Sequence, residues 1–437
     1  SVFAAKAAQA GKQVLMLEAG PERSNNDLVS SQLWARRLKW GGAQVEEEGN
    51  LKVGHSFNTG WGTGGSSMHH YAVWPRLHGN DFKLKSLYGK GNDWPIDYED
   101  LRPAYDQIQS EVGISGDEKL EKWRPAGAPY PMPGLPVFNQ GEIIAKGFAA
   151  LGRTTAPIPL AINSRPYKNR SSCIYDGWCD AGCPTGALAN AQTVYLPQAK
   201  AAKATIINHA TVTRLLTTQK GDKVTGVEYC DETGKRHVQM ADVVVLAAFA
   251  VQNPRLLLAS ANQAHPDGLA NSSGLVGKYL MTHPATSIYG LFKQPTQPYL
   301  GATGGQLINQ DSYDDKRARE GAFGGYQWLI ANALKPNGLL GIANTRPDIY
   351  GPRLDAGAEQ ICTGPRVAMH IMGGTIMGTA RDNSVTNRYG QCHDIANLFI
   401  AGTGLFPSSG AVNPTFSLHA LGLQAVEYML REWEDIV

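Results

Sequence analysis

The sequence predicts an α/β fold in which one discontinuous domain is interrupted by a second, less regular one. Residues 1–11 have an Ala-rich amphipathic pattern typical of a helix, and residues 12–18 follow as a short apolar strand that ends in Glu18. Two further apolar runs, at 242–248 and 397–402, have the character of buried strands. These three strands are all short and apolar but lie far apart in the chain. We therefore expect the chain to return to the same domain at each of them.

The other elements follow from periodicity and capping signals. Alternating apolar and polar residues predict a meander of strands, and stretches of helical periodicity predict helices. The strands are expected at 205–217, 224–230 and 236–240, and the helices at 97–113, 254–260 and 414–432. Asp97 is the expected cap of the first of these helices, because its short carboxylate can accept the free N–H groups of the first turn.

Length and composition exclude several classes of protein. The chain has 437 residues, enough for roughly three domains or two large ones. Its net charge is 40 − 38 = +2 and it has no long basic run, so nothing indicates a nucleic-acid partner. The longest strongly apolar run, at 243–251, is much shorter than the roughly 20 residues of a membrane helix. We therefore expect contact with a membrane only through a partner.

The first residues have the pattern of half a dinucleotide-binding unit. A helix, a glycine, an apolar strand and a terminal Glu form the second half of such a βαβ unit. Glu18 would then accept hydrogen bonds from the ribose hydroxyls of an adenine nucleotide, whether NAD or FAD. The alternative is an ordinary exposed Glu after a strand. Glycine makes up 49 of 437 residues, about 11 % against a usual ~7 %, which predicts close backbone approaches such as those around a large cofactor.

Three of the six cysteines lie close together and are followed by a proline. Cys173, Cys179 and Cys183 have the spacing Cys-x5-Cys-x3-Cys-Pro. The cysteine motif of bacterial ferredoxins also ends in Cys-x3-Cys-Pro. Three thiolates without a fourth predict an iron–sulfur cluster, either three-iron and four-sulfide or four-iron with one ligand that is not cysteine. A zinc site would need a fourth ligand, and fortuitously buried cysteines are the remaining alternative. The candidate fourth ligands are Asp176, Asp180 and His209, and the cysteines expected to bind no metal are Cys230, Cys362 and Cys392.

One histidine and one asparagine stand in surroundings that suit redox chemistry. His370 lies in the segment MHIMGGTIMG, whose glycines let a bulky ring system approach. Asn413 precedes Pro414 at the mouth of a predicted helix N-terminus, where backbone amides favour a negative charge such as that of a reduced flavin. From the chemistry alone, a catalytic role and an ordinary structural role for His370 both remain open.

Six long segments occur in the same order in the glucose–methanol–choline (GMC) oxidoreductases, and the chain resembles that family over most of its length. The segments are LEAG at 17–20, GTGGSSMHH at 62–70, VVVLAAFAVQNPRLLL at 243–258, VGKYLMTHP at 276–284, HIMGGTIMG at 370–378 and NLFIAGTGLFPSSGAVNPT at 397–415. Residues 80–105 and the three clustered cysteines are similar to the catalytic subunits of bacterial membrane-associated FAD sugar dehydrogenases, which act on glucose, fructose, gluconate, sorbitol or glucosides. Against this pattern, a Gly-rich fingerprint before Ser1 and some residues around 340–366 are missing, and we interpret both as residues left out of this sequence.

The resemblance implies roles for individual residues. His370 would be the active-site base and Asn413 its partner. Glu18 would bind the FAD ribose, and the backbone of Val212 would meet the adenine. His69 aligns with a histidine that in some relatives, pyranose 2-oxidase among them, is bonded covalently to the flavin. The further expected cofactor-binding residues are Gly64, Gly65, Gly402, Asn413, Pro414 and Thr415, and the expected cluster ligands are Cys173, Cys179 and Cys183.

The resemblance also implies an architecture. An FAD-binding Rossmann-like domain would hold an inserted antiparallel-sheet substrate domain, and a separate loop would carry the cluster. The FAD-binding domain is expected at 1–80, 185–285 and 366–437, the substrate domain at 81–172 and 286–365, and the cluster loop at 173–184.

The implied function is the FAD-dependent dehydrogenation of a carbinol in a sugar, sugar acid or glycoside. The hydride would pass to the flavin and the electrons would leave through the cluster to a cytochrome c subunit. An oxidase gives its electrons to O₂ and needs no cluster, so oxidase action is not expected as the main role. A small signal-bearing, chaperone-like subunit and a periplasmic site at the inner membrane are further expectations. The alternatives are an NAD-dependent dehydrogenase, a non-catalytic or electron-carrying subunit of the same fold, and a soluble cytoplasmic enzyme with a ferredoxin-like acceptor.

Overall fold

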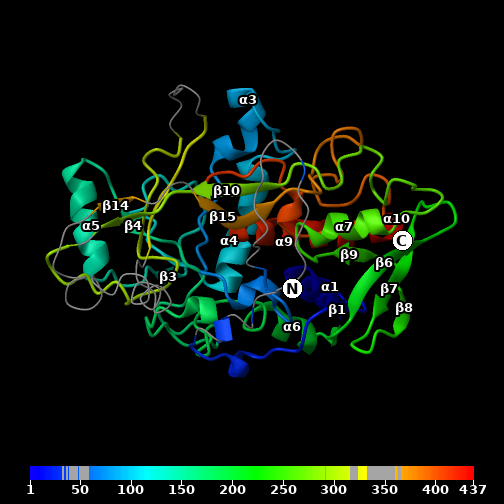
Figure 1. The fold of residues 1–437 in the computed structure, drawn as a ribbon, viewed down its shortest axis with the longest axis horizontal. Coiled ribbons are helices and arrows are strands. Elements are labelled where there is room, and N and C mark those ends of the chain that lie inside the picture. Colours follow the sequence, from blue (N-terminus) through cyan, green and yellow to red (C-terminus); the bar gives the residue numbers. More distant parts are fainter. Residues whose placement is uncertain are drawn as a thin grey trace.

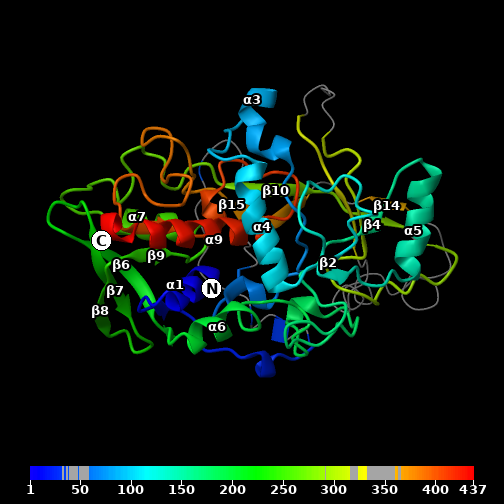
Figure 2. The same cartoon turned by 180° about the vertical axis from the view of Figure 1, so that it is seen from behind.

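The structure, a computed structural model, describes residues 1–31, 34, 35, 38, 48, 59–290, 292–314, 323–331, 360–362 and 366–437. Most of the region around 340–366, where the chain departs from the family pattern, therefore lies outside the described residues. Figures 1 and 2 show the strands β6 (Thr211–Thr217), β7 (Val224–Cys230) and β8 (Arg236–Met240) at one end of the molecule and helix α5 (Asn139–Ala150) at the other. None of the helices in these ranges is both long and apolar enough to cross a bilayer.

The predicted half of the dinucleotide-binding unit is present at the start of the chain. Helix α1 (Val2–Gln9) is followed by strand β1 (Leu15–Leu17), as its apolar pattern predicts. Strand β1 pairs in parallel with β5 (Thr205–Ile207). Helix α1 packs against α6 (Tyr195–Ala201) and α9 (Thr415–Arg431), because its alanines leave room for close helix contacts. This packing holds the carboxyl end of β1, where Glu18 follows, in a fixed place.

The predicted strand 205–217 is divided in two, which corrects the expectation of a single meander. Its first three residues form β5 and belong to the parallel pair with β1, whereas only β6 joins β7 and β8 in the antiparallel meander. The break falls at His209, whose backbone has φ +55 and so leaves the extended conformation. The N–H of His209 donates to the carbonyl of Gly20 at 3.0 Å, which anchors the turn beside β1.

Two strands that are far apart in the chain form one parallel pair, as the sequence predicts. Strand β9 (Val244–Leu246) pairs with β16 (Leu398–Ile400), and Leu398 lies opposite Val244. All three residues of β16 are buried, so both faces of this strand contribute to the core. Helix α7 (Gln252–Ala259) follows β9 in the predicted place. This pairing joins two of the three predicted apolar strands, while the discontinuous domain and its boundaries stay a prediction.

The two long helices also form where they are predicted. Helix α4 (Tyr98–Val112) begins after Asp97, whose side chain accepts from the N–H of Asp100, while the Asp100 side chain accepts from the N–H of Asp97. Helix α4 packs across α9, as Figure 2 shows. Tyr105 of α4 is fully buried there, and its hydroxyl lies 2.6 Å from that of Ser417.

Antiparallel pairs make up the less regular part of the chain. Strand β12 (Leu307–Asn309) lies between β13 (Trp328–Ile330) and β4 (Ala156–Pro157), β10 (Met281–Ala285) pairs with β15 (Arg366–Met372), and β11 (Ile288–Gly290) pairs with β14 (Gln360–Cys362). The other short elements are α3 (Leu84–Tyr88), α10 (Trp433–Ile436) and the parallel pair of β2 (Ser115–Gly116) with β3 (Met132–Pro133). The pair of β10 with β15 brings two histidines together, and both strands end at the predicted boundary between the FAD-binding and substrate domains.

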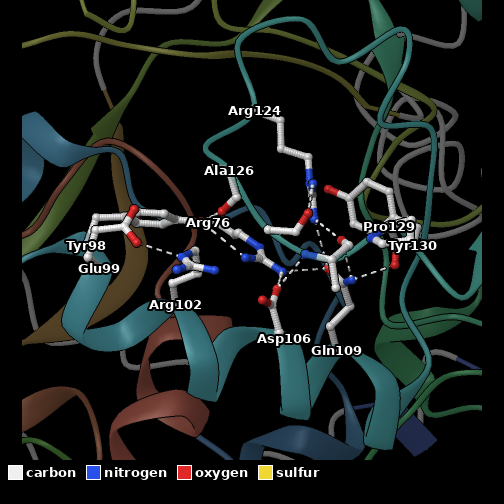
Figure 3. Close-up of polar contacts among 12 residues, drawn as sticks. Arg76, Tyr98, Glu99, Arg102, Asp106, Gln109, Arg124, Ala126, Pro129 and Tyr130 are labelled. Carbon is white, nitrogen blue, oxygen red and sulfur yellow. Dashed lines mark hydrogen bonds and ion pairs between the residues drawn. The ribbon is translucent and has the colours of Figure 1, made fainter.

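A buried arginine that precedes helix α4 in the chain ties its own segment to that helix. The side chain of Arg76 is 1 % exposed and donates to Asp106 at 2.6 Å, to Gln109 at 3.0 Å and to the hydroxyl of Tyr98 at 3.1 Å. Arg124 also donates to Gln109, at 3.2 Å (Figure 3). The arginines thus provide hydrogen-bond donors to the carboxylate of Asp106 and the amide oxygen of Gln109, as buried polar groups require.

Candidate active site

His370 and Asn413 lie together, as the resemblance implies. His370 is on strand β15, and Asn413 directly precedes Pro414, the cap of helix α9. The side-chain nitrogen Nδ2 of Asn413 lies 3.3 Å from Nε2 of His370. Two segments 43 residues apart in the chain therefore present one imidazole and one amide to the same place.

A second histidine, which the sequence analysis did not single out, contacts the other side of His370. His283 lies on β10 at a register shift between Thr282 and Pro284, opposite β15. The Nδ1 atoms of the two histidines are 2.9 Å apart, and Nε2 of His283 is 2.9 Å from the carbonyl oxygen of Gly410. The motif VGKYLMTHP contains His283, but only the pairing of β10 with β15 shows what it contacts.

Burial keeps His370 uncharged. Removal from water lowers the pKa of His370 to about 3, and the neighbouring His283 lowers it further in the same direction. Burial also lowers the pKa of His283. A neutral imidazole has one nitrogen with a free lone pair, which is what a general base needs near neutral pH.

The orientation of Asn413 is set by a glutamine that was also missed. Nε2 of Gln327 donates to Oδ1 of Asn413 at 3.2 Å, and Nε2 of Gln310 donates to Oε1 of Gln327 at 3.2 Å. With its oxygen occupied, the amide of Asn413 presents its NH₂ group to His370. Gln327 could not be found from the sequence, because it lies in a stretch of weak periodicity.

Glu18 lies where a ribose-binding carboxylate is expected. One of its oxygens accepts from the N–H of Gly20 at 2.8 Å and from the N–H of Gly62 at 3.2 Å. The N–H of Ala210 donates to the carbonyl of Glu18 at 2.9 Å. Val212 follows two residues later on β6, so the two residues expected at the adenosine end lie at one edge of the structure.

Two of the glycines expected around the cofactor have open space beside them. Gly64 and Gly65 have φ of +100 and +53, and Gly402 has φ +124, conformations that favour glycine. A Cβ at Gly65 or Gly402 would meet nothing within 4 Å, so open space lies beside both backbones. His69 caps the short 3₁₀ turn Gly65–Met68 and is buried. Together with Glu18, these residues fit a dinucleotide.

The three clustered cysteines each accept a backbone hydrogen bond at sulfur. The donors are Tyr175 N to Cys173 at 3.4 Å, Thr303 N to Cys179 at 3.4 Å and Leu188 N to Cys183 at 3.5 Å. Burial raises the pKa of Cys173 to about 12 and that of Cys179 to about 11, and the neighbouring cysteines add to both shifts. Across the described ranges, however, no three His, Cys, Asp or Glu side chains are grouped closely enough to hold a metal ion. The cluster therefore stays a prediction; the side chain of Cys362 lies outside the described residues.

Family models decide the identity of the fold. Models described as GMC oxidoreductase match residues 55–285 and 308–422. The chain belongs to the GMC oxidoreductase family. It is accordingly an FAD-dependent oxidoreductase that acts on the CH–OH group of alcohols or sugars, and the NAD alternative is wrong.

Curated relatives support this assignment. This GMC oxidoreductase is 32 % identical to the 2-methyl-1,2-propanediol dehydrogenase of Mycolicibacterium austroafricanum, over 86 % of this chain and 81 % of that protein. It is 27 % identical to the fructose dehydrogenase large subunit of Gluconobacter japonicus, over 99 % and 96 % of the two chains. It is 25 % identical to the gluconate 2-dehydrogenase flavoprotein of Pantoea cypripedii, over 84 % and 78 %.

Solved structures confirm the predicted fold class. Pyridoxine 4-oxidase from Mesorbium loti superposes with a TM-score of 0.66 at 18 % identity, covering 98 % of this chain and 96 % of that one. Formate oxidase from Aspergillus oryzae RIB40, in its R554A form, gives a TM-score of 0.66 at 15 % identity over 100 % and 96 %. At these identities the likeness extends to the fold alone.

Proposed function

We propose that this GMC oxidoreductase is a dehydrogenase of sugars, sugar acids or related polyols, with His370 as the base that accepts the hydroxyl proton. The observation that carries the proposal is the pair of His370 and Asn413, whose facing nitrogens lie 3.3 Å apart. The names of two relatives, fructose dehydrogenase large subunit and gluconate 2-dehydrogenase flavoprotein, support the substrate class.

The oxidation divides a carbinol into a hydride, a proton and a carbonyl. Glu18 and the glycine-rich segments would hold FAD, which would supply the acceptor for the hydride that leaves the carbon. His370 accepts the hydroxyl proton at Nε2, because burial keeps this imidazole neutral. Asn413 donates from Nδ2 to the substrate oxygen and orients the O–H toward His370. The N-terminal end of α9, which begins two residues after Asn413, favours negative charge at the same place.

Anaerobic mixing with a panel of substrates tests the proposal. The purified flavoprotein should lose its visible flavin absorbance with at least one of fructose, gluconate, sorbitol or a methyl glucoside. Pyridoxine and formate serve as controls and should leave the spectrum unchanged. If no sugar or polyol reduces the flavin absorbance of protein that is fully loaded with FAD, the dehydrogenase assignment is wrong. A non-catalytic subunit then becomes the better description.

We further propose that Cys173, Cys179 and Cys183 hold a three-iron, four-sulfide cluster that passes electrons onward. Such a cluster carries electrons one at a time. Two observations support the assignment: the compact spacing of the cysteines and the backbone N–H donor at each sulfur, which suits a thiolate.

Replacing Cys179 by serine tests this cluster separately from the flavin chemistry. The variant should lose iron and reduce an external one-electron acceptor more slowly, while substrate still bleaches its flavin at the normal rate. Cys230→Ser is the matched control, because Cys230 is a partly buried free cysteine on β7. Iron content that is the same in both variants and in the wild type would remove the three cysteines from consideration.

Partners and location follow from the same proposal. A one-electron carrier needs a second polypeptide, and we propose a cytochrome c subunit, a small signal-bearing chaperone-like subunit and a periplasmic site peripheral to the inner membrane. The large-subunit name of one relative supports an assembly of several chains. Co-purification and cell fractionation distinguish this from a cytoplasmic enzyme with a ferredoxin-like acceptor.

A further inference from the structure

His283 uses both of its ring nitrogens in hydrogen bonds. Its Nε2 lies 2.9 Å from the carbonyl oxygen of Gly410 and 3.3 Å from that of Ser409. Its Nδ1 lies 2.9 Å from Nδ1 of His370. The two rings are perpendicular, at 89° with centroids 5.1 Å apart, so they do not stack and the two Nδ1 atoms join them.

The carbonyl of Gly410 determines which ring nitrogen carries the proton in His283 and, through it, in His370. A carbonyl only accepts, so Nε2 of His283 carries the proton and its Nδ1 has the lone pair. The facing Nδ1 of His370 must then be the donor. A neutral His370 that donates from Nδ1 keeps its lone pair on Nε2, the atom that faces Asn413.

The hydrogen bonds that reach His370 from the side of Asn413 lead to the same tautomer of His370. Gln310 donates to Gln327, which donates to Oδ1 of Asn413, and Asn413 therefore donates from Nδ2 toward His370. Gln310 is 3 % exposed, so this end is held in the core. Each of the five hydrogen bonds from Gln310 to Gly410 runs in the same direction, and reversing one of them would leave two donors or two acceptors facing each other.

We infer that His283 is a positioning residue that holds His370 in the tautomer with its proton on Nδ1 and its basic lone pair toward the substrate. The inference rests on the proposed role of His370 as base. In the opposite tautomer, Nε2 of His370 would already carry a proton and could not accept the one that the substrate hydroxyl must lose. His283 touches neither substrate nor flavin in this account and acts only through His370.

Two substitutions at position 283 separate the hydrogen bond from simple packing. His283→Leu removes the acceptor for His370 and should lower the rate of flavin reduction by about 10- to 100-fold with little change in KM, as loss of a supporting partner typically does. His283→Asn retains an acceptor oxygen near the position of Nδ1 and should restore most of that rate. His265→Leu is the matched control, since His265 also bonds a backbone carbonyl, that of Gly221 at 2.9 Å, but in the turn between β6 and β7.

A spectroscopic measurement reports the tautomer itself. With ¹⁵N-labelled histidine in the flavoprotein, His370 should show a protonated Nδ1 and an unprotonated Nε2, and its signals are assigned by their loss in His370→Gln. In His283→Leu the two nitrogens should become more alike as the tautomers mix.

The outcomes are distinguishable. A protonated Nε2 on His370 in the wild type overturns the inference even if no variant folds, and so does a leucine variant that reduces its flavin at the normal rate. Equal impairment of the leucine and asparagine variants assigns His283 to packing and also overturns it. If His370→Ala itself reduces flavin normally, the proposed function of His370 has failed instead.

Discussion

Replacing His370 by alanine should slow the reduction of the bound flavin by substrate about 100-fold or more. General bases typically contribute factors of about 10² to 10⁴, and His370 has the only lone pair that the described contacts direct at the amide of Asn413. Substrate binding should change less, because Asn413 remains to donate to the substrate oxygen. Single-turnover stopped-flow measurements without oxygen separate the two effects.

The control for this variant is His393→Ala, which removes a histidine that bonds the hydroxyl of Ser384 and lies outside the site. It should reduce its flavin at the wild-type rate. Near-normal reduction in His370→Ala would remove His370 from the chemistry, whatever the steady-state rate shows.

The pH dependence of the wild type belongs to the same prediction. A His370 with its pKa lowered to about 3 stays unprotonated as the pH falls, so its contribution to flavin reduction should not change between about pH 8 and about pH 5. Acid should instead act on stability, because the unfolded chain binds the proton at the ordinary pKa of ~6.5 and the folded one does not. A loss of single-turnover rate centred at the ordinary histidine pKa contradicts the buried, neutral base.

Replacing Arg76 by methionine should lower the free energy of unfolding by about 3 kcal/mol. Removing one partner of a buried ion pair leaves the other without compensation, and such losses are about 3–5 kcal/mol. Here Asp106, Gln109 and the hydroxyl of Tyr98 would all lose a donor at once. Denaturant unfolding of the flavoprotein at neutral pH measures the change.

Figure 3 contains the matched control for this variant. Arg102 lies on α4, the helix that Arg76 contacts, and pairs with Glu99 at 2.6 Å, but both side chains are exposed, at 41 % and 62 %. Arg102→Met should leave stability nearly unchanged, because water replaces an exposed ion pair at little cost. Equal effects of the two substitutions would show that burial of Arg76 does not decide the stability of this network.

Local signals in the sequence determined much of the fold. The cap at Asp97 and the periodicity that follows it predicted helix α4 almost to the residue, because a helix start depends on groups within one turn of each other. The amphipathic helix and the apolar run that ends in Glu18 likewise indicated a nucleotide site, since both signals are local. The long family motifs then indicated the chemistry, and with it His370 and Asn413.

Only the tertiary structure decided which distant residues meet. Nothing local distinguishes residues 205–207, which pair with β1, from the meander strand that follows them. His283 and Gln327 contact the candidate catalytic pair only because β10 pairs with β15 and because the segment before β13 lies beside Asn413. The physical reason is that hydrogen bonds between side chains depend on positions set by long-range strand pairing, whereas caps and turns depend on neighbours along the chain.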